Sequence, residues 1–118
     1  MIKHESEIKK SPVYADGANE VSKQILAGPR DGFPGFLREF SLAAGGYTPY
    51  HHHGWYHLVY ILEGSGLFKY EGREYPVKKG AVAYIEAHKE HGFTNTGDQE
   101  MSFLCLVPGE GDEYPGDE

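Results

Sequence analysis

Short apolar runs separated by glycine-rich breaks dominate the chain from Lys23 onward. The runs are rich in Tyr, Phe, Val, Ile and Leu, and none keeps a 3.6-residue apolar stripe over three turns, as an amphipathic helix would. They predict strands at residues 24–27, 36–42, 47–53, 57–63, 67–71, 74–77, 82–86, 92–95 and 101–107. Short strands at this spacing favour an all-β, antiparallel sandwich or barrel in a single domain.

The two ends of the chain depart from this pattern. Residues 1–22 mix charges with a turn and show no steady period, so we expect an N-terminal arm beside a barrel of residues 23–108. The last ten residues hold five acids and no base. We therefore expect residues 109–118 to form a solvated, flexible acidic tail.

Charge and composition narrow the classes of function. The net charge is −7, but five of the 18 acids lie in the tail, so residues 1–108 carry only −2. A nearly neutral body without a Lys/Arg cluster argues against nucleic-acid binding. The sequence shows no run of 18 apolar residues, no signal peptide and only one cysteine. We therefore expect a cytoplasmic protein that does not enter a membrane.

Histidines gather in one part of the chain: four of the seven lie between residues 51 and 57. Since alternate residues of a strand point to the same face, His51 and His53 share a face, and His57 joins them if the chain stays extended through Gly54. His91 begins a later strand, which sheet pairing could bring alongside as a source of a fourth ligand. Such imidazoles suit one transition-metal ion, although a short histidine run is about as often a solvated turn.

Glycines and histidines together form two longer patterns. One stretch reads Gly45-(x)5-His51-x-His53-(x)3-His57-(x)6-Gly64, and the second reads Gly80-(x)10-His91-(x)3-Asn95. With these residues the sequence resembles the cupin superfamily, whose motifs are G(x)5HxH(x)3,4E(x)6G and G(x)5PxG(x)2H(x)3N. The resemblance implies an antiparallel double-stranded β-helix, the jelly-roll or cupin barrel. It also implies a metal site formed by His51, His53, His57 and His91.

The sequence departs from the cupin motifs at two places. His57 replaces the usual glutamate ligand, which makes the sequence similar to single-domain cupins that hold a metal, manganese among them, with four histidines. Glu86-Ala87-His88 replaces PxG, so the loop before His91 is expected to differ in shape. We expect one divalent transition metal per chain. The resemblance favours Mn, whereas imidazole ligands by themselves suit Fe, Ni, Cu or Zn.

Several side chains near the motifs are candidates for the pocket wall: Arg38, Phe40, Trp55, Tyr84, Phe93, Phe103 and Cys105. Each aromatic residue is more often simply part of the core. Arg38 either anchors a substrate carboxylate through its planar fork or forms an ordinary ion pair. Cys105 is either a small buried hydrophobe or, if it faces the metal, an oxidation-prone neighbour of the site.

These features lead to competing hypotheses of function. The first is a small metal-dependent oxidoreductase of the dioxygenase type, acting on a small oxygenated organic substrate, with no catalytic side chain assigned apart from the metal ligands. The second is a non-catalytic module that binds a sugar or another small molecule. An isomerase ranks last because no base can be identified, and the fold does not choose among these chemistries. The resemblance also implies a homodimer in which N-terminal strands cross to the partner's sheet.

Overall fold

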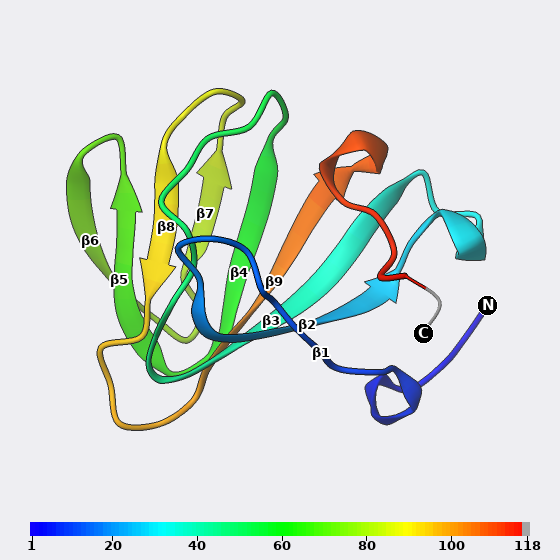
Figure 1. The fold of residues 1–118 in the computed structure, drawn as a ribbon, viewed down its shortest axis with the longest axis horizontal. Helices are drawn as coiled ribbons and strands as arrows, with labels where there is room; N and C mark the ends of the chain where they lie inside the picture. Colours follow the sequence, from blue (N-terminus) through cyan, green and yellow to red (C-terminus); the bar gives the residue numbers. More distant parts are fainter. Residues whose placement is uncertain (117–118) are drawn as a thin grey trace.

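The computed structural model describes residues 1–116, and almost all of its regular structure is strand (Figure 1). The strands are β1 (Ser11–Pro12), β2 (Asn19–Ala27), β3 (Gly35–Tyr47), β4 (His57–Glu63), β5 (Ser65–Tyr70), β6 (Arg73–Lys78), β7 (Val82–Ile85), β8 (His91–Thr94) and β9 (Met101–Pro108). Three short 3-10 turns complete the elements: η1 (Glu5–Glu7), η2 (Pro29–Asp31) and η3 (Gly109–Gly111). Within residues 1–116, no helix is long and apolar enough to cross a membrane.

The strands form one curled antiparallel sheet in the order β6-β5-β8-β3-β9-β4-β7, with β2 added beside β3 and β1 beside β2. Strand β3 is the long central element, because it pairs with β2, β8 and β9 along different parts of its length. Figure 1 shows β6, β5 and β8 on one side and β2, β3 and β9 on the other. This arrangement confirms the predicted all-β jelly-roll class.

The N-terminal boundary differs from the expectation. Strand β2 begins at Asn19 and pairs with β3 from Asn19 to Ala27, so a boundary after residue 22 falls inside a strand. The register of β2 shifts between Asn19 and Val21, where Glu20 takes a positive φ of 54°. This bulge lets the chain keep pairing where the sequence showed no steady alternation. An exchange of N-terminal strands between two copies stays a prediction.

The strand expected at residues 47–53 is wrong beyond Tyr47. Pro49 has no N–H for a ladder, and the chain leaves β3 as a loop that runs to β4. The loop stays attached to β8 because Thr48 N–H donates to Phe93 O at 2.9 Å, and His51 forms an isolated antiparallel bridge with His91.

The segment after β9 differs from a solvated tail. The Asp112 side chain is only 9% exposed and forms ion pairs with Lys23 and Arg38. The Tyr114 ring packs edge-on against Phe36 with centroids 5.3 Å apart. The expectation is therefore corrected for these residues, because long-range partners that sequence composition does not show hold them against the barrel. Residues 117 and 118 of the expected tail lie outside the described residues.

The core fills the inside of the curled sheet. A row of aromatic rings crosses it, from Phe68 to Phe93 (4.7 Å between centroids), to Phe103 (4.6 Å) and to Phe40 (5.4 Å). Apolar side chains with at most 2% exposure lie beside this row: Leu42, Val59, Ile61, Ile85, Met101 and Val107. Two buried polar side chains, His57 and His91, lie at the starts of β4 and β8.

Two residues of the sequence motifs hold turns in place. Gly64 has φ +81°, and an added Cβ would lie 2.7 Å from Glu100 O, so any larger residue would be strained there. Asn95 is 1% exposed, and its Nδ2 donates to the carbonyls of Leu42, Ala43 and Gln99. These motif positions therefore support the fold rather than the chemistry of the site.

Candidate metal centre

Backbone pairing brings the histidine-rich loop against β8. His51 N–H donates to His91 O at 3.0 Å, and His91 N–H donates back to His51 O at 2.8 Å. His88 N–H donates to His53 O at 2.6 Å and fixes the next part of the loop. His88 itself adopts φ +69° at the place where the cupin motif has glycine. The loop between β7 and β8 thus replaces that glycine by a residue in the left-handed region, which is uncommon for a non-glycine residue.

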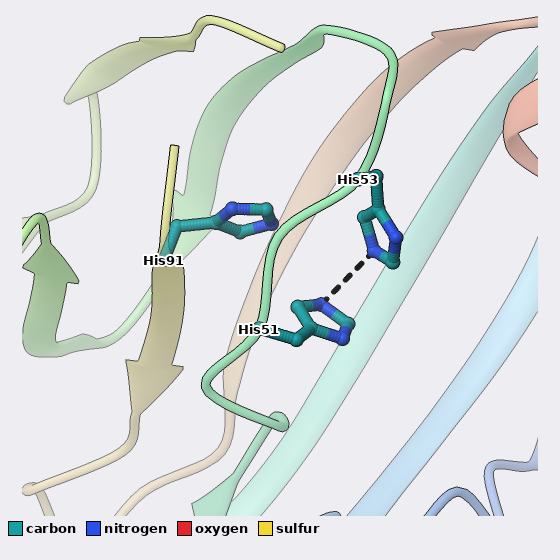
Figure 2. A group of neighbouring side chains, drawn as sticks. All are labelled: His51, His53 and His91. Atoms are coloured by element: carbon teal, nitrogen blue, oxygen red, sulfur yellow. Dashed lines mark hydrogen bonds between the residues drawn. The ribbon is translucent and has the colours of Figure 1, made fainter. Parts of the chain in front are cut away.

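Three histidines converge in space, as Figure 2 shows: His51 and His53 come from the loop and His91 from β8. Each offers a ring nitrogen that lies within 4.8 Å of the corresponding nitrogens of the other two. The Nε2 atoms of His51 and His53 are 3.2 Å apart. Nitrogens bound to one ion at about 2.1 Å lie roughly 3–4 Å from each other. The three side chains are therefore positioned to bind a metal ion.

The fourth predicted ligand, His57, lies beside this group without belonging to it. Its ring centroid is 4.7 Å from that of His91 and 5.3 Å from that of His53. The side chain is 7% exposed, and among the described residues its buried Nε2 has no hydrogen-bond partner. A buried polar atom without a partner is rare in folded proteins. A metal ion at the cluster would provide that missing partner.

The surroundings of all four imidazoles favour the neutral form. Burial, followed by the charges of the neighbouring groups, lowers the pKa of His57 to about 3 and that of His51 to about 4. Burial also lowers the pKa of His53 and of His91, the latter against an opposing hydrogen bond to Lys89 O. A neutral imidazole keeps a lone pair for a metal. The donor set therefore fits a divalent transition-metal ion.

Hydrogen bonding assigns the proton on His91. Its Nδ1 lies 2.9 Å from Lys89 O. Because a carbonyl oxygen only accepts, Nδ1 carries the hydrogen and Nε2 keeps the lone pair. This arrangement, in which the second nitrogen of a ligand donates to a backbone carbonyl, is common in metal sites.

A cavity of about 180 Å³ adjoins the histidines, and all four of them line it. Five of the seven expected wall residues also line it: Arg38, Phe40, Phe93, Phe103 and Cys105. Its remaining walls come from residues that sequence reasoning missed: Val13, Ala15, Val21, Lys23, Thr48, Pro49, Val59, Ile85 and Gly111. The alternation of apolar residues along β4 indicates that Val59 faces inward. Nothing in the sequence indicates that the N-terminal residues or Gly111 would line the cavity.

Two expected wall residues lie elsewhere. Tyr84 is 61% exposed, because it shares the outward-facing side of β7 with Val82, and it borders a different cleft beside Tyr75. Trp55 is not in the wall but stacks on His53, with centroids 4.7 Å apart and an interplanar angle of 4°. Trp55 therefore supports one of the histidines instead of contacting the cavity.

Arg38 is engaged in a buried ion pair. It is 5% exposed, and its Nη1 donates to Asp112 Oδ2 at 3.0 Å, while Lys23 Nζ donates to Asp112 Oδ1 at 2.9 Å. Burial by itself raises the pKa of Asp112, but the Lys23 hydrogen bond and the charges of Arg38 and Lys23 outweigh it, so the pKa lies below its usual value. Arg38 is thus an ion-pair partner, and its partner is buried rather than on the surface.

Comparisons with known proteins agree with the fold. An oxalate-binding protein of Thermotoga maritima is 34% identical over 56 residues, which are 48% of this chain and 46% of that protein, so the chain spans less than half the length of this curated relative. The structure of a polyketide cyclase from Streptomyces resistomycificus superposes with a TM-score of 0.85 at 33% identity, covering 92% of this chain and 80% of that chain. A predicted oxalate decarboxylase from Thermotoga maritima gives a TM-score of 0.83 at 26% identity, covering 92% and 98%. Residues 38–107 match the cupin domain, and the chain belongs to this family.

Proposed function

We propose that the protein is a metal-dependent enzyme that acts on a small, enolisable, oxygenated organic compound. The observation that carries this proposal is the cluster of neutral histidines on the wall of a largely apolar cavity. His51, His53, His57 and His91 would hold one divalent transition metal. The ion, when bound, would supply Lewis-acid stabilisation of a carbonyl or enolate oxygen.

The cavity wall defines what such a substrate contacts. Phe40, Phe93 and Phe103 line the cavity and give it an apolar wall beside the histidines. A volume of about 180 Å³ is close to that of an apolar cavity of roughly 150 Å³ that holds benzene. The site therefore suits a substrate portion of about one ring. Similarity to the polyketide cyclase, at 33% identity over 92% of this chain, supports chemistry at an enolisable carbonyl.

A dioxygenase-type oxidoreductase is the second candidate. The histidine-only donor set is compatible with it, since imidazole suits the redox metals Fe and Cu as well as Zn. We rank the dioxygenase lower because the thiol of Cys105 lies 3.3 Å from His57. A thiol next to an oxygen-activating metal is open to oxidation. Similarity to the oxalate-binding protein supports a third reading, a binding module without turnover.

Metal analysis followed by two parallel assays tests the proposal. The purified protein is loaded with Mn²⁺, Fe²⁺, Co²⁺ or Zn²⁺ and incubated with aryl 1,3-dicarbonyl compounds in D₂O. We expect metal-dependent deuterium exchange at the carbon between the carbonyls, without oxygen uptake. The His52→Ala variant is the matched control, because His52 is exposed and lies outside the cavity wall.

Other outcomes identify the competing functions. Oxygen uptake that depends on metal and substrate would establish the dioxygenase type. Retention of oxalate or a dicarbonyl compound without exchange or oxygen uptake would establish the binding module. Failure to retain any of the four metals would refute the metal site itself.

A further inference from the structure

The sulfur of Cys105 lies between a histidine of the metal centre and a buried arginine. Its Sγ is 3.3 Å from His57 Nδ1 and 3.0 Å from Arg38 Nη2. All three residues are at most 7% exposed. The sheet brings them together, because Cys105 on β9 pairs with Arg38 on β3 and with Val59 on β4, two residues along the strand from His57.

Arg38 makes the sulfur a hydrogen-bond acceptor. A guanidinium group carries only donors, so Nη2 must donate to Sγ. The same guanidinium is oriented by two further hydrogen bonds, from Nε to Cys105 O at 3.3 Å and from Nη1 to Asp112 Oδ2 at 3.0 Å. With three contacts, the planar group has little freedom to turn away from the sulfur.

The contact between Cys105 and His57 allows two arrangements. In one, His57 Nδ1–H donates to Sγ, and the buried Nε2 keeps its lone pair. In the other, the thiol donates to Nδ1, and Nε2 carries a buried hydrogen that has no acceptor among the described residues. In the metal-free protein the first arrangement leaves two groups without partners, the S–H group, which is a weak donor, and the Nε2 lone pair, which a metal ion would take. The second leaves a buried imidazole N–H unpaired and no lone pair on Nε2 for a metal ion.

We propose that Cys105 is a positioning residue that accepts from His57 Nδ1–H and so presents Nε2 of His57 to the metal. The inference rests on the metal site of the proposed function. Cys105 thereby does for His57 what Lys89 O does for His91. Arg38 and, behind it, Asp112 keep the sulfur in this role.

Two measurements on the same variants test this role. The first records the tautomer of His57 in the metal-free protein from ¹⁵N chemical shifts, assigned by the signals lost in His57→Gln. The second is a titration of the metal-free protein with Co²⁺ alone. Cys105→Ala removes the acceptor, Cys105→Ser keeps one, and Ser102→Ala is the control, since Ser102 is also buried on β9 but outside the cavity wall.

The wild type is expected to show hydrogen on Nδ1 of His57. In Cys105→Ala we expect a mixture of tautomers and a Co²⁺ affinity lower by about 10- to 100-fold. Cys105→Ser should restore the Nδ1–H tautomer and most of the affinity, and Ser102→Ala should match the wild type in both measurements. Melting temperatures report the loss of packing separately.

The two measurements separate failure of this inference from failure of the metal site. Hydrogen on Nε2 of His57 in the wild type would overturn the role of Cys105, whether or not Co²⁺ binds. A Cys105→Ala protein with a lower melting temperature but an unchanged tautomer and Co²⁺ affinity would also overturn the positioning role. Cys105 would then contribute only to the packing of the core. A wild type that shows the Nδ1–H tautomer but binds no Co²⁺ would support the hydrogen bond from His57 to Cys105 and count against the metal site of the proposed function.

Discussion

The four histidines form two pairs that the fold holds in different ways. His57 and His91 are the first residues of β4 and β8, and they are 7% and 5% exposed. His51 and His53 lie on the loop between β3 and β4 and are only half-buried. The strand pair has partners outside the cluster, Cys105 for His57 and Lys89 O for His91. The backbone of the loop pair is bonded to His91 and His88, whereas its side chains contact mainly each other and Trp55.

From this difference we expect the two pairs to contribute differently to metal binding. The strand pair is placed by sheet register and oriented by buried hydrogen bonds, so in the proposed centre it would be the prearranged half. The half-buried side chains of the loop pair would complete the coordination of an ion. Preorganised ligands lose less freedom on binding, so they contribute more to affinity than ligands that must first be ordered.

Removing one ligand from each pair is expected to give the largest effect. His91→Ala should lower Co²⁺ affinity by about 100-fold or more, whereas His53→Ala should lower it by about 10-fold, taking the range for support of metal ligands as a guide. Metal content by mass spectrometry and Co²⁺ titration measure both losses, with circular dichroism to confirm folding and His52→Ala as control. Equal losses for the two variants would contradict the division between the pairs.

Breaking the ion pair behind the strand pair should mainly affect stability. Arg38→Met leaves the Asp112 carboxylate, which is 9% exposed, with Lys23 and the Glu113 N–H as its remaining partners among the described residues. Removing one partner of a buried pair costs about 3 kcal/mol of the free energy of unfolding, and urea unfolding measures the change. The double variant Arg38→Met, Asp112→Asn should recover part of the loss. No recovery would show that the two side chains are not energetically coupled.

Acid should weaken the same ion pair. The pKa of Asp112 is lowered in the folded protein, so its contribution to stability is complete above the unfolded pKa of about 3.9. The contribution is lost as the pH falls through the lower, folded pKa. Urea unfolding of the metal-free protein between pH 6 and pH 3, as an approximate range, should show a steeper loss for the wild type than for Asp112→Asn. Parallel curves would contradict the lowered pKa.

The smallest effect is expected from the ring that supports the loop pair. Trp55→Ala removes the stack on His53, a contact worth about 1 kcal/mol, which corresponds to a roughly fivefold lower Co²⁺ affinity. Trp55→Phe should keep most of it. Tyr84→Ser, which changes an exposed residue at another cleft, should have no effect. If Trp55→Ala lowered Co²⁺ affinity as much as His91→Ala, the loop pair would contribute as much to metal affinity as the strand pair.

The sequence predicts which histidines come together better than it predicts the secondary structure of the segments that contain them. The motif spacing points to four histidines, and all four line one cavity, three of them positioned to bind a metal ion. It does not show that residues 48–56 form a loop, since aromatic residues and histidines there resemble a strand. Tyr84 is placed on the wrong side because an aromatic residue on a short strand does not reveal which face is inward. His88 fills the glycine position of the motif as expected, at a positive φ.

The partners of Arg38 lie beyond what sequence reasoning can find. Asp112 is 74 residues from Arg38 and 89 from Lys23. Nothing in its neighbourhood distinguishes it from the other acids near the C-terminus. Only the folding of the segment after β9 across the barrel brings these charges together, and composition alone favours a solvated tail.

The position of Asp112 has a practical consequence for trimming the protein. The cupin match ends at residue 107, and β9 ends at Pro108, so a chain shortened there would look complete as a barrel. Such a chain would leave the guanidinium of Arg38 without its carboxylate, two contacts away from the imidazole of His57. Domain boundaries drawn from the family match would therefore remove the buried ion pair, and we expect such a fragment to be less stable than the longer chain.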